Sequence, residues 1–269
     1  MAQDVVVVVG VGGMGLAIAR RTGSGRKVLL ADFSEPTLGS AADVLRGEGH
    51  EVTTHPVDVS DAASVAALAE AADGLGRVTH VVHTAGLSPV QAPVDAVLRV
   101  DLLGVALSLD AFGAVVAAGG AGVVIASMAG HMMTLPPEQE KALRTTATDE
   151  LLALPFVADV TEPGMAYVLA KRGNTLRVEA AAAAWGARGA RINSISPGVI
   201  STAMGQQELS GESGEGMRGM VAMSGTGRLG TPDDIAAAAT FLLGPDASFI
   251  TGTDLLVDGG VVAAVRGLM

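Results

Sequence analysis

Short apolar runs alternate along the chain with segments whose apolar residues recur at helical spacing. Val5–Val9 is an unbroken run of β-branched residues, which is typical of a parallel strand buried on both faces. Six further strands are expected at Lys27–Asp32, Val52–Val57, Val78–Thr84, Gly122–Ser127, Arg191–Ser196 and Asp254–Val257. Between them we expect helices that end at Arg21 and that cover Glu35–Glu48, Ala62–Ala72, most of Asp95–Ala118, Gly164–Ala187 and Pro232–Leu243. The alternation predicts a single α/β domain over residues 1–269, with a doubly wound, mostly parallel seven-stranded sheet and helices on both faces.

Two segments interrupt this alternation. Residues 131–163 are polar and contain prolines, with a short helix expected at Asp149–Leu154, and residues 203–228 are rich in Gly, Ser and Met. Long irregular segments in compact domains are usually lids, binding loops or disordered stretches. Both segments follow predicted strand ends on the side where such sheets bind ligands.

Composition and charge exclude several classes of function. The net charge is −11 and no Lys/Arg cluster offsets it, so we expect no nucleic-acid partner. The chain has no Cys, which excludes disulfides and thiol catalysis, and its five His residues form no ligand-spaced cluster that predicts a metal. The N-terminus lacks a signal-peptide layout, and Ala111–Ala126 is too short and too rich in glycine to be a membrane helix. We expect a soluble, cytoplasmic protein with no membrane partner.

A glycine-rich turn follows the first predicted strand and precedes a helix. Its residues are Gly10, Val11, Gly12, Gly13, Met14 and Gly15, which contain the pattern G-x-G-x-x-G. Glycines at this spacing allow a tight turn and let a pyrophosphate approach the backbone, where the helix N-terminus favours its charge. The turn therefore predicts a dinucleotide site, although glycine-rich turns also occur without a ligand.

Asp32 ends the second predicted strand, 17 positions after Gly15. A carboxylate there can accept hydrogen bonds from an adenine-ribose hydroxyl and repels a 2′-phosphate, which favours NAD over NADP. The following Phe33 offers no positive charge for a phosphate, whereas Arg20 and Arg21 keep NADP open. The alternative for Asp32 is an acid that only caps a helix or ends a strand.

Tyr167 and Lys171 are four residues apart in a predicted helix, so both side chains leave the same face. A phenol ionises near pH ~10 in water, and an adjacent ammonium lowers that pKa. The pair can transfer protons, but alone it is more often a core tyrosine beside a solvated lysine.

Together with other motifs, the glycine turn and this pair resemble the short-chain dehydrogenase/reductases over essentially the whole chain. The shared features, in order, are the glycine-rich turn, Asp58-Val59, Ala85-Gly86, Ser127, Tyr167-x-x-x-Lys171, Pro197-Gly198 and Asp258-Gly259-Gly260. The resemblance implies a Rossmann fold and reversible hydride transfer between a nicotinamide cofactor and an alcohol or carbonyl.

The resemblance also implies a role for each matching residue. Tyr167 would be the general acid/base, Lys171 would hold the nicotinamide ribose and lower the Tyr167 pKa, and Ser127 would hydrogen-bond the substrate oxygen. The remaining cofactor contacts would come from Asp58 and Val59 beside the adenine, Ala85 and Gly86 along the cofactor, and Pro197, Gly198 and Thr202 at the nicotinamide end. Plain structural roles, such as a helix cap for Asp58 or a turn for Pro197-Gly198, are the alternatives.

Several residues depart from the family pattern. The glycine turn is one residue shorter than usual and Val9 replaces its Thr, while His83-Thr84 stands where two asparagines are common. We interpret His83 as a structural residue of its strand. Asp101 takes the place of the family's fourth catalytic residue, an Asn that acts through its backbone carbonyl. A backbone role survives such a change, the added carboxylate would raise the Lys171 pKa, and simple pairing of Asp101 with a cation is the alternative.

The largest departure is the distance of 40 positions between Ser127 and Tyr167, which makes 131–163 an insertion that we expect to cover the substrate pocket. Residues 203–228 correspond to the substrate lid, and Met204–Met223 within it suits an apolar substrate, although a surface loop anchored by methionines fits nearly as well. The helices after the fourth and fifth strands and the C-terminal strand resemble those that build family dimers and tetramers, so a homo-oligomer is implied.

Two hypotheses of function follow. The first is an NAD-dependent dehydrogenase or reductase that acts on a small-molecule alcohol or ketone, apolar or cyclic. It rests on the complete set of Ser127, Tyr167 and Lys171. The second is a non-catalytic dinucleotide-binding redox sensor of the same fold, which rests on Asp101 and on the insertion. A complete catalytic set is hard to explain in a pure sensor, so the enzyme is favoured.

Overall fold

The computed structural model, which describes residues 3–90, 92–211 and 214–267, contains a parallel sheet in the order β3-β2-β1-β4-β5-β6-β7. The strands are β1 (Asp4–Val9), β2 (Lys27–Asp32), β3 (Glu51–Pro56), β4 (Arg77–His83), β5 (Ala121–Ile125), β6 (Arg191–Pro197) and β7 (Asp254–Val257). Every strand pair is parallel, from Val5 opposite Lys27 in β1 and β2 to Ser194 opposite Asp254 in β6 and β7. The predicted doubly wound fold is confirmed.

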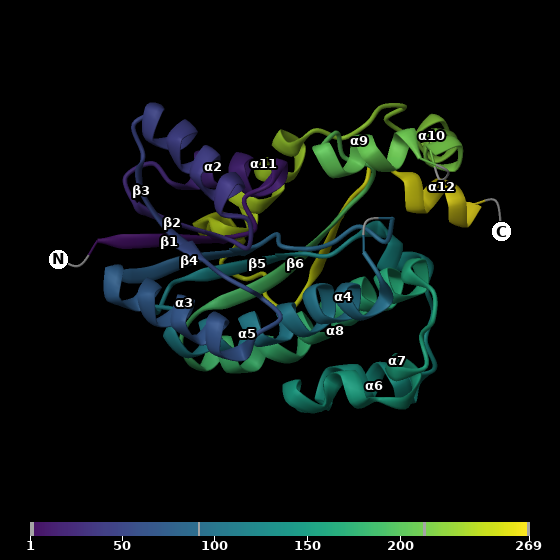
Figure 1. The fold of residues 1–269 in the computed structure, drawn as a ribbon, viewed down its shortest axis with the longest axis horizontal. Coiled ribbons are helices and arrows are strands. Elements are labelled where there is room, and N and C mark those ends of the chain that lie inside the picture. The colour runs from purple at the N-terminus through teal and green to yellow at the C-terminus, as the bar shows by residue number, and fades with distance from the viewer. Residues whose placement is uncertain (1–2, 91, 212–213, 268–269) are drawn as a thin grey trace.

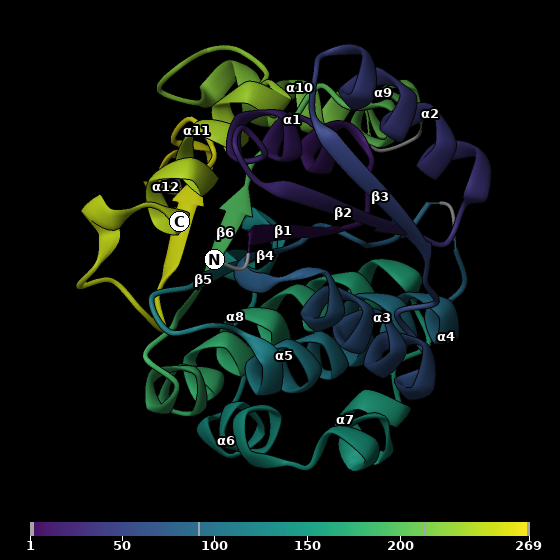
Figure 2. The same ribbon diagram turned by 90° about the vertical axis from the view of Figure 1, so that its left-hand side faces the viewer.

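Helices cover both faces of this sheet (Figure 2). One face carries α1 (Gly13–Thr22), α2 (Glu35–Gly47) and α11 (Pro232–Leu243), and the other carries α3 (Ala62–Leu75), α5 (Gly104–Val115) and α8 (Pro163–Ala187). Ile18, Leu38 and Ile235 belong to the core on the first face, and Leu68, Phe112 and Trp185 to the core on the second. The buried valines of β1 divide between the two cores, as expected for a strand covered on both sides.

The predicted helix over Asp95–Ala118 is divided into three pieces. It consists of α4 (Val94–Val97), a π-helical turn η1 (Leu98–Leu103) and α5. π-Helical turns inside α-helices are often found at functional sites, and this one carries Asp101. In the part of the chain that the structure describes, no helix has both the length and the apolarity to cross a membrane.

Segment 131–163 forms an additional layer outside the second helical face (Figures 1 and 2). It contains the end of η2 (Met128–Met132), then α6 (Pro137–Thr145), η3 (Thr148–Ala153) and α7 (Pro155–Ala158). The predicted short helix appears as η3, a 3-10 helix, whereas α6 was not predicted. Leu143 and Leu151 are fully buried in a cluster shared with η1 and α8. Arg177 of α8 donates hydrogen bonds to the Thr146 carbonyl at 2.7 Å and the Thr148 hydroxyl at 2.8 Å.

Three helices lie together beyond the ends of β6 and β7 (Figure 1). They are α9 (Ala203–Ser210), α10 (Gly214–Met223) and α12 (Val261–Gly267), whereas η4 (Pro245–Ala247) packs against α11. Met217, Met220 and Val221 of α10 pack against Val261 and Val262 of α12 in one cluster. Residues 203–228 are therefore mainly helical, although their composition suggested an irregular segment.

The strand order reverses between β1 and β4. In such sheets the connections that leave in opposite directions open a crevice at the carboxyl ends of the strands. Gly10 occupies this point with φ +87°, and a Cβ there would lie 2.4 Å from the Ala85 nitrogen. A Cβ on Gly15 would lie 2.0 Å from the Gly10 oxygen. Both glycines are thus required by the close approach of the turn, α1 and the end of β4.

His83 lies at the end of β4 with 1% of its surface exposed. Burial above all, together with the Lys171 ammonium, lowers the pKa of His83 to about 3. The side chain is therefore neutral around pH 7 in the folded protein, in keeping with its interpretation as a structural residue.

The buried neutral His83 predicts loss of stability in acid. An unfolded histidine binds a proton near pH ~6.5, so the unfolded chain binds more protons than the folded one as the pH falls from there toward 3. Between pH 6 and 4 this single group should lower the free energy of unfolding by about 1.4 kcal/mol per pH unit. Denaturant unfolding measured across that pH range should give a free energy of unfolding that falls less steeply with decreasing pH in His83→Gln, by this amount per pH unit.

His83→Asn provides the control for packing, because it is equally unable to titrate but leaves a different cavity. Both variants should lose the same part of the slope even if their absolute stabilities differ. A variant slope equal to that of the unaltered protein would disprove the assignment of a buried neutral histidine.

Candidate active site

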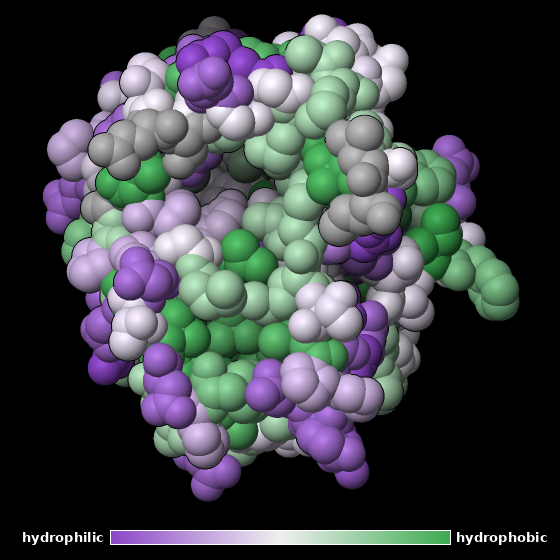
Figure 3. All heavy atoms as spheres, turned by 90° about the vertical axis from the view of Figure 1, so that its right-hand side faces the viewer, coloured by the Kyte–Doolittle hydropathy of each residue, from purple (hydrophilic) through white to green (hydrophobic). Residues whose placement is uncertain are grey.

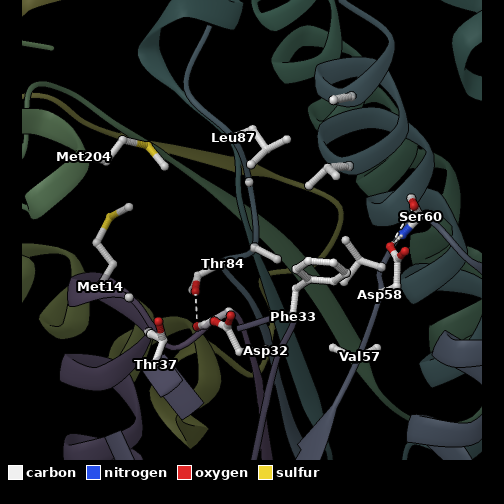
Figure 4. A pocket seen from close by; sticks show the side chains of 18 of the residues that line it. Met14, Asp32, Phe33, Thr37, Val57, Asp58, Ser60, Thr84, Leu87 and Met204 are labelled. Carbon is white, nitrogen blue, oxygen red and sulfur yellow. Dashed lines mark hydrogen bonds between the residues drawn. The ribbon is translucent and has the colours of Figure 1, made fainter. Parts of the chain in front are cut away.

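A cavity of about 610 Å³ opens where β1, β2 and β4 end (Figure 4). Twelve of the residues predicted to bind a cofactor line it. They are Gly10, Gly12, Gly13, Met14, Gly15, Asp32, Phe33, Asp58, Val59, Ala85, Gly86 and Thr202. The fold therefore brings together residues that are spread over some 190 positions of the chain, from Gly10 to Thr202.

The glycine turn leaves room for a phosphate group. A Cβ on Gly12 would meet no atom within 4 Å, whereas one on Gly13 would lie 3.2 Å from Thr202 Cγ2. Gly12 caps α1 without a side-chain hydrogen bond, and the first N–H groups of any helix lack intrahelical partners. Free donors and a helix dipole facing an open space fit the pyrophosphate of a dinucleotide.

Asp32 is held rigidly at the floor of the cavity. Its Oδ2 accepts a hydrogen bond from the Val11 backbone N–H at 2.8 Å, and its Oδ1 accepts one from the Ser34 N–H at 2.9 Å. Phe33 stands between Asp32 and Asp58 with its ring in the cavity (Figure 4) and is 78% exposed. Met14 and Met204 lie on the opposite side of the cavity from Asp58 (Figure 4). A carboxylate beside an open aromatic ring fits the adenosine half of a dinucleotide.

A second cavity of about 250 Å³ adjoins the first, and the two share Met14, Thr202 and Met204. Ser127, Tyr167, Pro197 and Gly198 line it. Ser127 lies two residues beyond the end of β5 and caps η2, where its Oγ accepts a hydrogen bond from the Ala129 N–H at 3.2 Å. The predicted serine and tyrosine therefore face one cavity next to the cofactor site.

Lys171 lies one turn after Tyr167 in α8, with its Nζ 5.3 Å from the centre of the Tyr167 ring. The same Nζ lies 3.1 Å from Asp101 Oδ2, and both side chains are buried. Asp101 Oδ1 accepts a hydrogen bond from the Leu87 backbone N–H at 2.7 Å. A Cβ on Gly86 would lie 3.2 Å from Lys171 Nζ and 3.3 Å from Asp101 Oδ2, so the glycine leaves space for the ion pair.

The pKa of Lys171 matches the sequence-based expectation. Burial by itself lowers the pKa of Lys171, but the Asp101 carboxylate and Tyr167 together raise it above its ordinary value. Burial raises the pKa of Asp101, while Lys171 and the Leu87 N–H oppose that rise. Asp101 does pair with a cation, and that cation is Lys171, so the ion pair and the raised Lys171 pKa are two aspects of one contact.

The pKa of Tyr167 differs from the expectation. Burial raises it above the ordinary value of a phenol, and this effect exceeds the lowering by Lys171 and by the hydrogen bond with Ser127. Asp101 and Glu208 add to the rise. Lys171 thus acts in the expected direction, but in the protein alone the net shift is upward because desolvation is the larger effect.

Segment 131–163 contributes no residue to the described lining of either cavity. It packs on the outer side of α8 because its apolar residues, such as Leu143 and Leu151, are buried there. The structure therefore does not show the covering role that we expected. Residues 203–228 do reach the second cavity, through Met204, Gly205, Glu208 and Met217.

Several lining residues had no signal in the sequence. Thr37, Ser60 and Arg99 line the larger cavity, and Glu208 lines the smaller one. Arg99 and Glu208 come from surface-like helical patterns, and only the tertiary fold places Arg99, which stays exposed, and the half-buried Glu208 beside these cavities. Arg99 is also paired with Asp95 at 2.9 Å.

Comparison with known proteins agrees with this geometry. Residues 4–136 match the family model described as short chain dehydrogenase, and residues 150–262 match that of enoyl-(acyl carrier protein) reductase. A short-chain dehydrogenase/reductase, bsc3, from Alternaria brassicicola is 41% identical over 98% of this chain and 97% of its own. The 3-alpha-hydroxysteroid dehydrogenase/carbonyl reductase of Comamonas testosteroni is 32% identical over 85% of this chain and 94% of its own.

Solved structures give the same result. The crystal structure of gox2181 superimposes with a TM-score of 0.78 at 25% identity, covering 98% of this chain and 97% of that one. The chain belongs to the short-chain dehydrogenase/reductase family.

Proposed function

We propose that this oxidoreductase transfers a hydride between NAD(H) and a largely apolar alcohol or ketone. The observation that carries the proposal is the arrangement of Ser127 and Tyr167 in one cavity, with Lys171 beside the Tyr167 ring and the larger, glycine-lined cavity next to them. A bound nicotinamide dinucleotide would supply or accept the hydride.

In the proposed mechanism, Ser127 and Tyr167 bind the substrate oxygen. During oxidation Tyr167 takes the hydroxyl proton, and during reduction it returns a proton to the carbonyl oxygen. The Lys171 ammonium lowers the cost of the phenolate, because an opposite charge within about 6 Å favours the ionised form. Asp101 holds Lys171 in place through the ion pair and keeps it protonated.

The preference for NAD rests on charge in the larger cavity. The fixed Asp32 carboxylate would repel a 2′-phosphate. Arg20 is paired with Glu48 at 2.7 Å, and neither Arg20 nor Arg21 is among the described residues that line the cavity. Arg99 does line it, but its charge is paired with Asp95 at 2.9 Å.

The apolar character of the substrate rests on the lining of the smaller cavity. Met14, Val90, Met128, Val199, Ile200, Met204 and Met217 contribute to it. Segment 203–228 would act as the substrate lid, since its methionines can adapt to different shapes. The relative from Comamonas testosteroni, named for a 3-alpha-hydroxysteroid, supports an apolar cyclic substrate.

We further infer a cytoplasmic homo-oligomer, dimer or tetramer. β7 lies at the edge of the sheet, and unpaired edges favour association. Phe241 of α11 and Phe249, which precedes β7, are 45% and 103% exposed. Exposed aromatic side chains of this kind are enriched at protein interfaces.

The redox-sensor alternative is not favoured. Asp101 does not displace the catalytic set but holds Lys171 next to Tyr167, and the curated relatives named above are dehydrogenases or reductases.

Tyr167→Phe should remove most turnover while NADH binding stays within about twofold. General acid/base catalysis contributes about a hundredfold or more, so kcat should fall by at least that factor on any alcohol that the unaltered protein oxidises. NADH absorbance measures turnover and fluorescence titration measures binding. Equal activity in the variant would reject the role of Tyr167.

The unaltered protein should bind NADH at least about tenfold more tightly than NADPH, because one unfavourable charge contact is worth about 1.4 kcal/mol or more. Asp32→Asn keeps the shape of the side chain and removes its charge, so it should reduce the difference between the affinities for NADH and NADPH. Fluorescence titration with both cofactors measures it. Tighter binding of NADPH by the unaltered protein would overturn the proposed preference.

Asp101→Asn should move the pH profile of alcohol oxidation toward higher pH. Burial lowers the pKa of Lys171 and Asp101 raises it, so the variant should lose the Lys171 charge at a lower pH, and with it the interaction that favours the Tyr167 phenolate. The pH dependence of kcat/KM measures the shift, with Asp43→Asn on the exposed face of α2 as the control. A shift toward lower pH, or none, would contradict the proposed electrostatic role of Asp101.

A further inference from the structure

The cavity that holds Ser127 and Tyr167 contains one ionisable side chain besides Tyr167 itself. Among its described lining residues this is Glu208, on α9, and neither Lys, Arg nor His contributes to the lining. Figure 3 shows the molecule from the side where α9 and α10 lie, and that face is hollowed. An acid in an otherwise apolar pocket is unexpected for a simple hydrophobic substrate, since burying a carboxylate without a partner is costly.

Glu208 is oriented by a hydrogen bond from a distant part of the chain. The Ser88 Oγ donates to Glu208 Oε1 at 2.5 Å, and Ser88 is fully buried in the loop that follows Ala85-Gly86. This bond joins α9 to the loop after β4, whose Pro89 and Val90 also line the cavity. Within the described residues no ion pair neutralises Glu208, and the nearest basic residue along the chain, Arg218, donates instead to the Leu209 carbonyl at 2.7 Å.

The charge of Glu208 acts at the reacting group. The carboxylate is one of the charges that raise the pKa of Tyr167, which places the two side chains within electrostatic range of each other. A substrate held by Ser127 and Tyr167 would therefore feel the same field. A second carboxylate or phosphate on that substrate would be repelled, whereas a hydrogen-bond donor could reach the remaining oxygen of Glu208.

We propose that Glu208 is a specificity-determining residue, which selects substrates that carry a second hydrogen-bond donor, a hydroxyl or an ammonium group, and rejects anionic ones. The inference rests on the proposed function, because it assumes that the cavity binds the reacting alcohol. It refines that function: the substrate is a largely apolar alcohol with a second donor group on the side that faces α9.

The test compares Glu208→Gln with the unaltered protein on a matched series. The series consists of cyclohexanol and its derivatives with a hydroxyl, amino or carboxylate group at the 3- or 4-position, oxidised with NAD. Relative to cyclohexanol, the unaltered protein should prefer a hydroxyl or amino derivative and should use the carboxylates at least about tenfold less well. Glu208→Gln should reduce this discrimination by about tenfold, which corresponds to the loss of about 1.4 kcal/mol.

Two further variants separate charge from orientation. Glu215→Gln removes the same charge from the exposed start of α10, outside the cavity, and should keep the selectivity of the unaltered protein. Ser88→Ala removes the bond that orients Glu208 but leaves its charge, so the carboxylates should stay excluded while the preference for donors weakens. With the unaltered protein, a higher kcat/KM than cyclohexanol for the hydroxyl derivatives alone would identify the donor as a hydroxyl. A higher kcat/KM for the amino derivatives alone would identify it as an ammonium.

Unchanged kcat/KM ratios in Glu208→Gln, or a preference of the unaltered protein for the carboxylates, would overturn the inference. Lack of turnover of the whole series would count against a cyclic substrate, which belongs to the proposed function. Glu208 would then be tested by binding: cyclohexanecarboxylate should bind the NADH complex of Glu208→Gln at least about tenfold more tightly than that of the unaltered protein, measured by NADH fluorescence. Equal affinities would reject the role of Glu208.

Discussion

The buried ion pair between Lys171 and Asp101 is the interaction on which the rest of the site depends. Its two charges lie 3.1 Å apart with almost no exposed surface, and removal of either partner from such a pair would leave an uncompensated buried charge. The pair joins α8 to η1, and the Leu87 N–H ties it to the loop after β4. Three segments that contribute to the lining of the two cavities, α8, η1 and the loop after β4, are thereby fixed relative to one another, with Gly86 allowing their close approach.

The inserted segment supports the same helix from outside. Arg177 of α8 binds the carbonyl of Thr146 and the hydroxyl of Thr148, and Arg172, next to Lys171, pairs with Glu140 of α6. Leu143 and Leu151 complete the contact through burial. Segment 131–163 therefore braces α8 from outside, while residues of α9 line the cavity beside Tyr167.

Elements with strong local signals could be predicted closely from the sequence, and long-range consequences could not. The predicted bounds of Lys27–Asp32, Pro232–Leu243 and Asp254–Val257 agree with β2, α11 and β7, helped in α11 by the capping box of Thr231 and Asp234. Twelve of the residues predicted to bind the cofactor line a common cavity, because the ends of parallel strands lie at one edge of the sheet. Three features could not be predicted. The sequence of α6 is polar and has few apolar residues to mark a helix, and the net pKa shift of Tyr167 depends on burial in the folded protein. The hydrogen bond between Ser88 and Glu208 joins residues 120 positions apart.

Tyr167 is the only tyrosine of the chain, so its ionisation can be followed directly by the ultraviolet absorbance of the phenolate, with Tyr167→Phe as the blank. The central claim is that the Lys171 charge, held by Asp101, makes the phenolate accessible inside a site whose burial opposes it. Titration of Lys171→Met should therefore show a Tyr167 pKa above that of the unaltered protein. An unchanged or lower pKa in the variant would contradict the account.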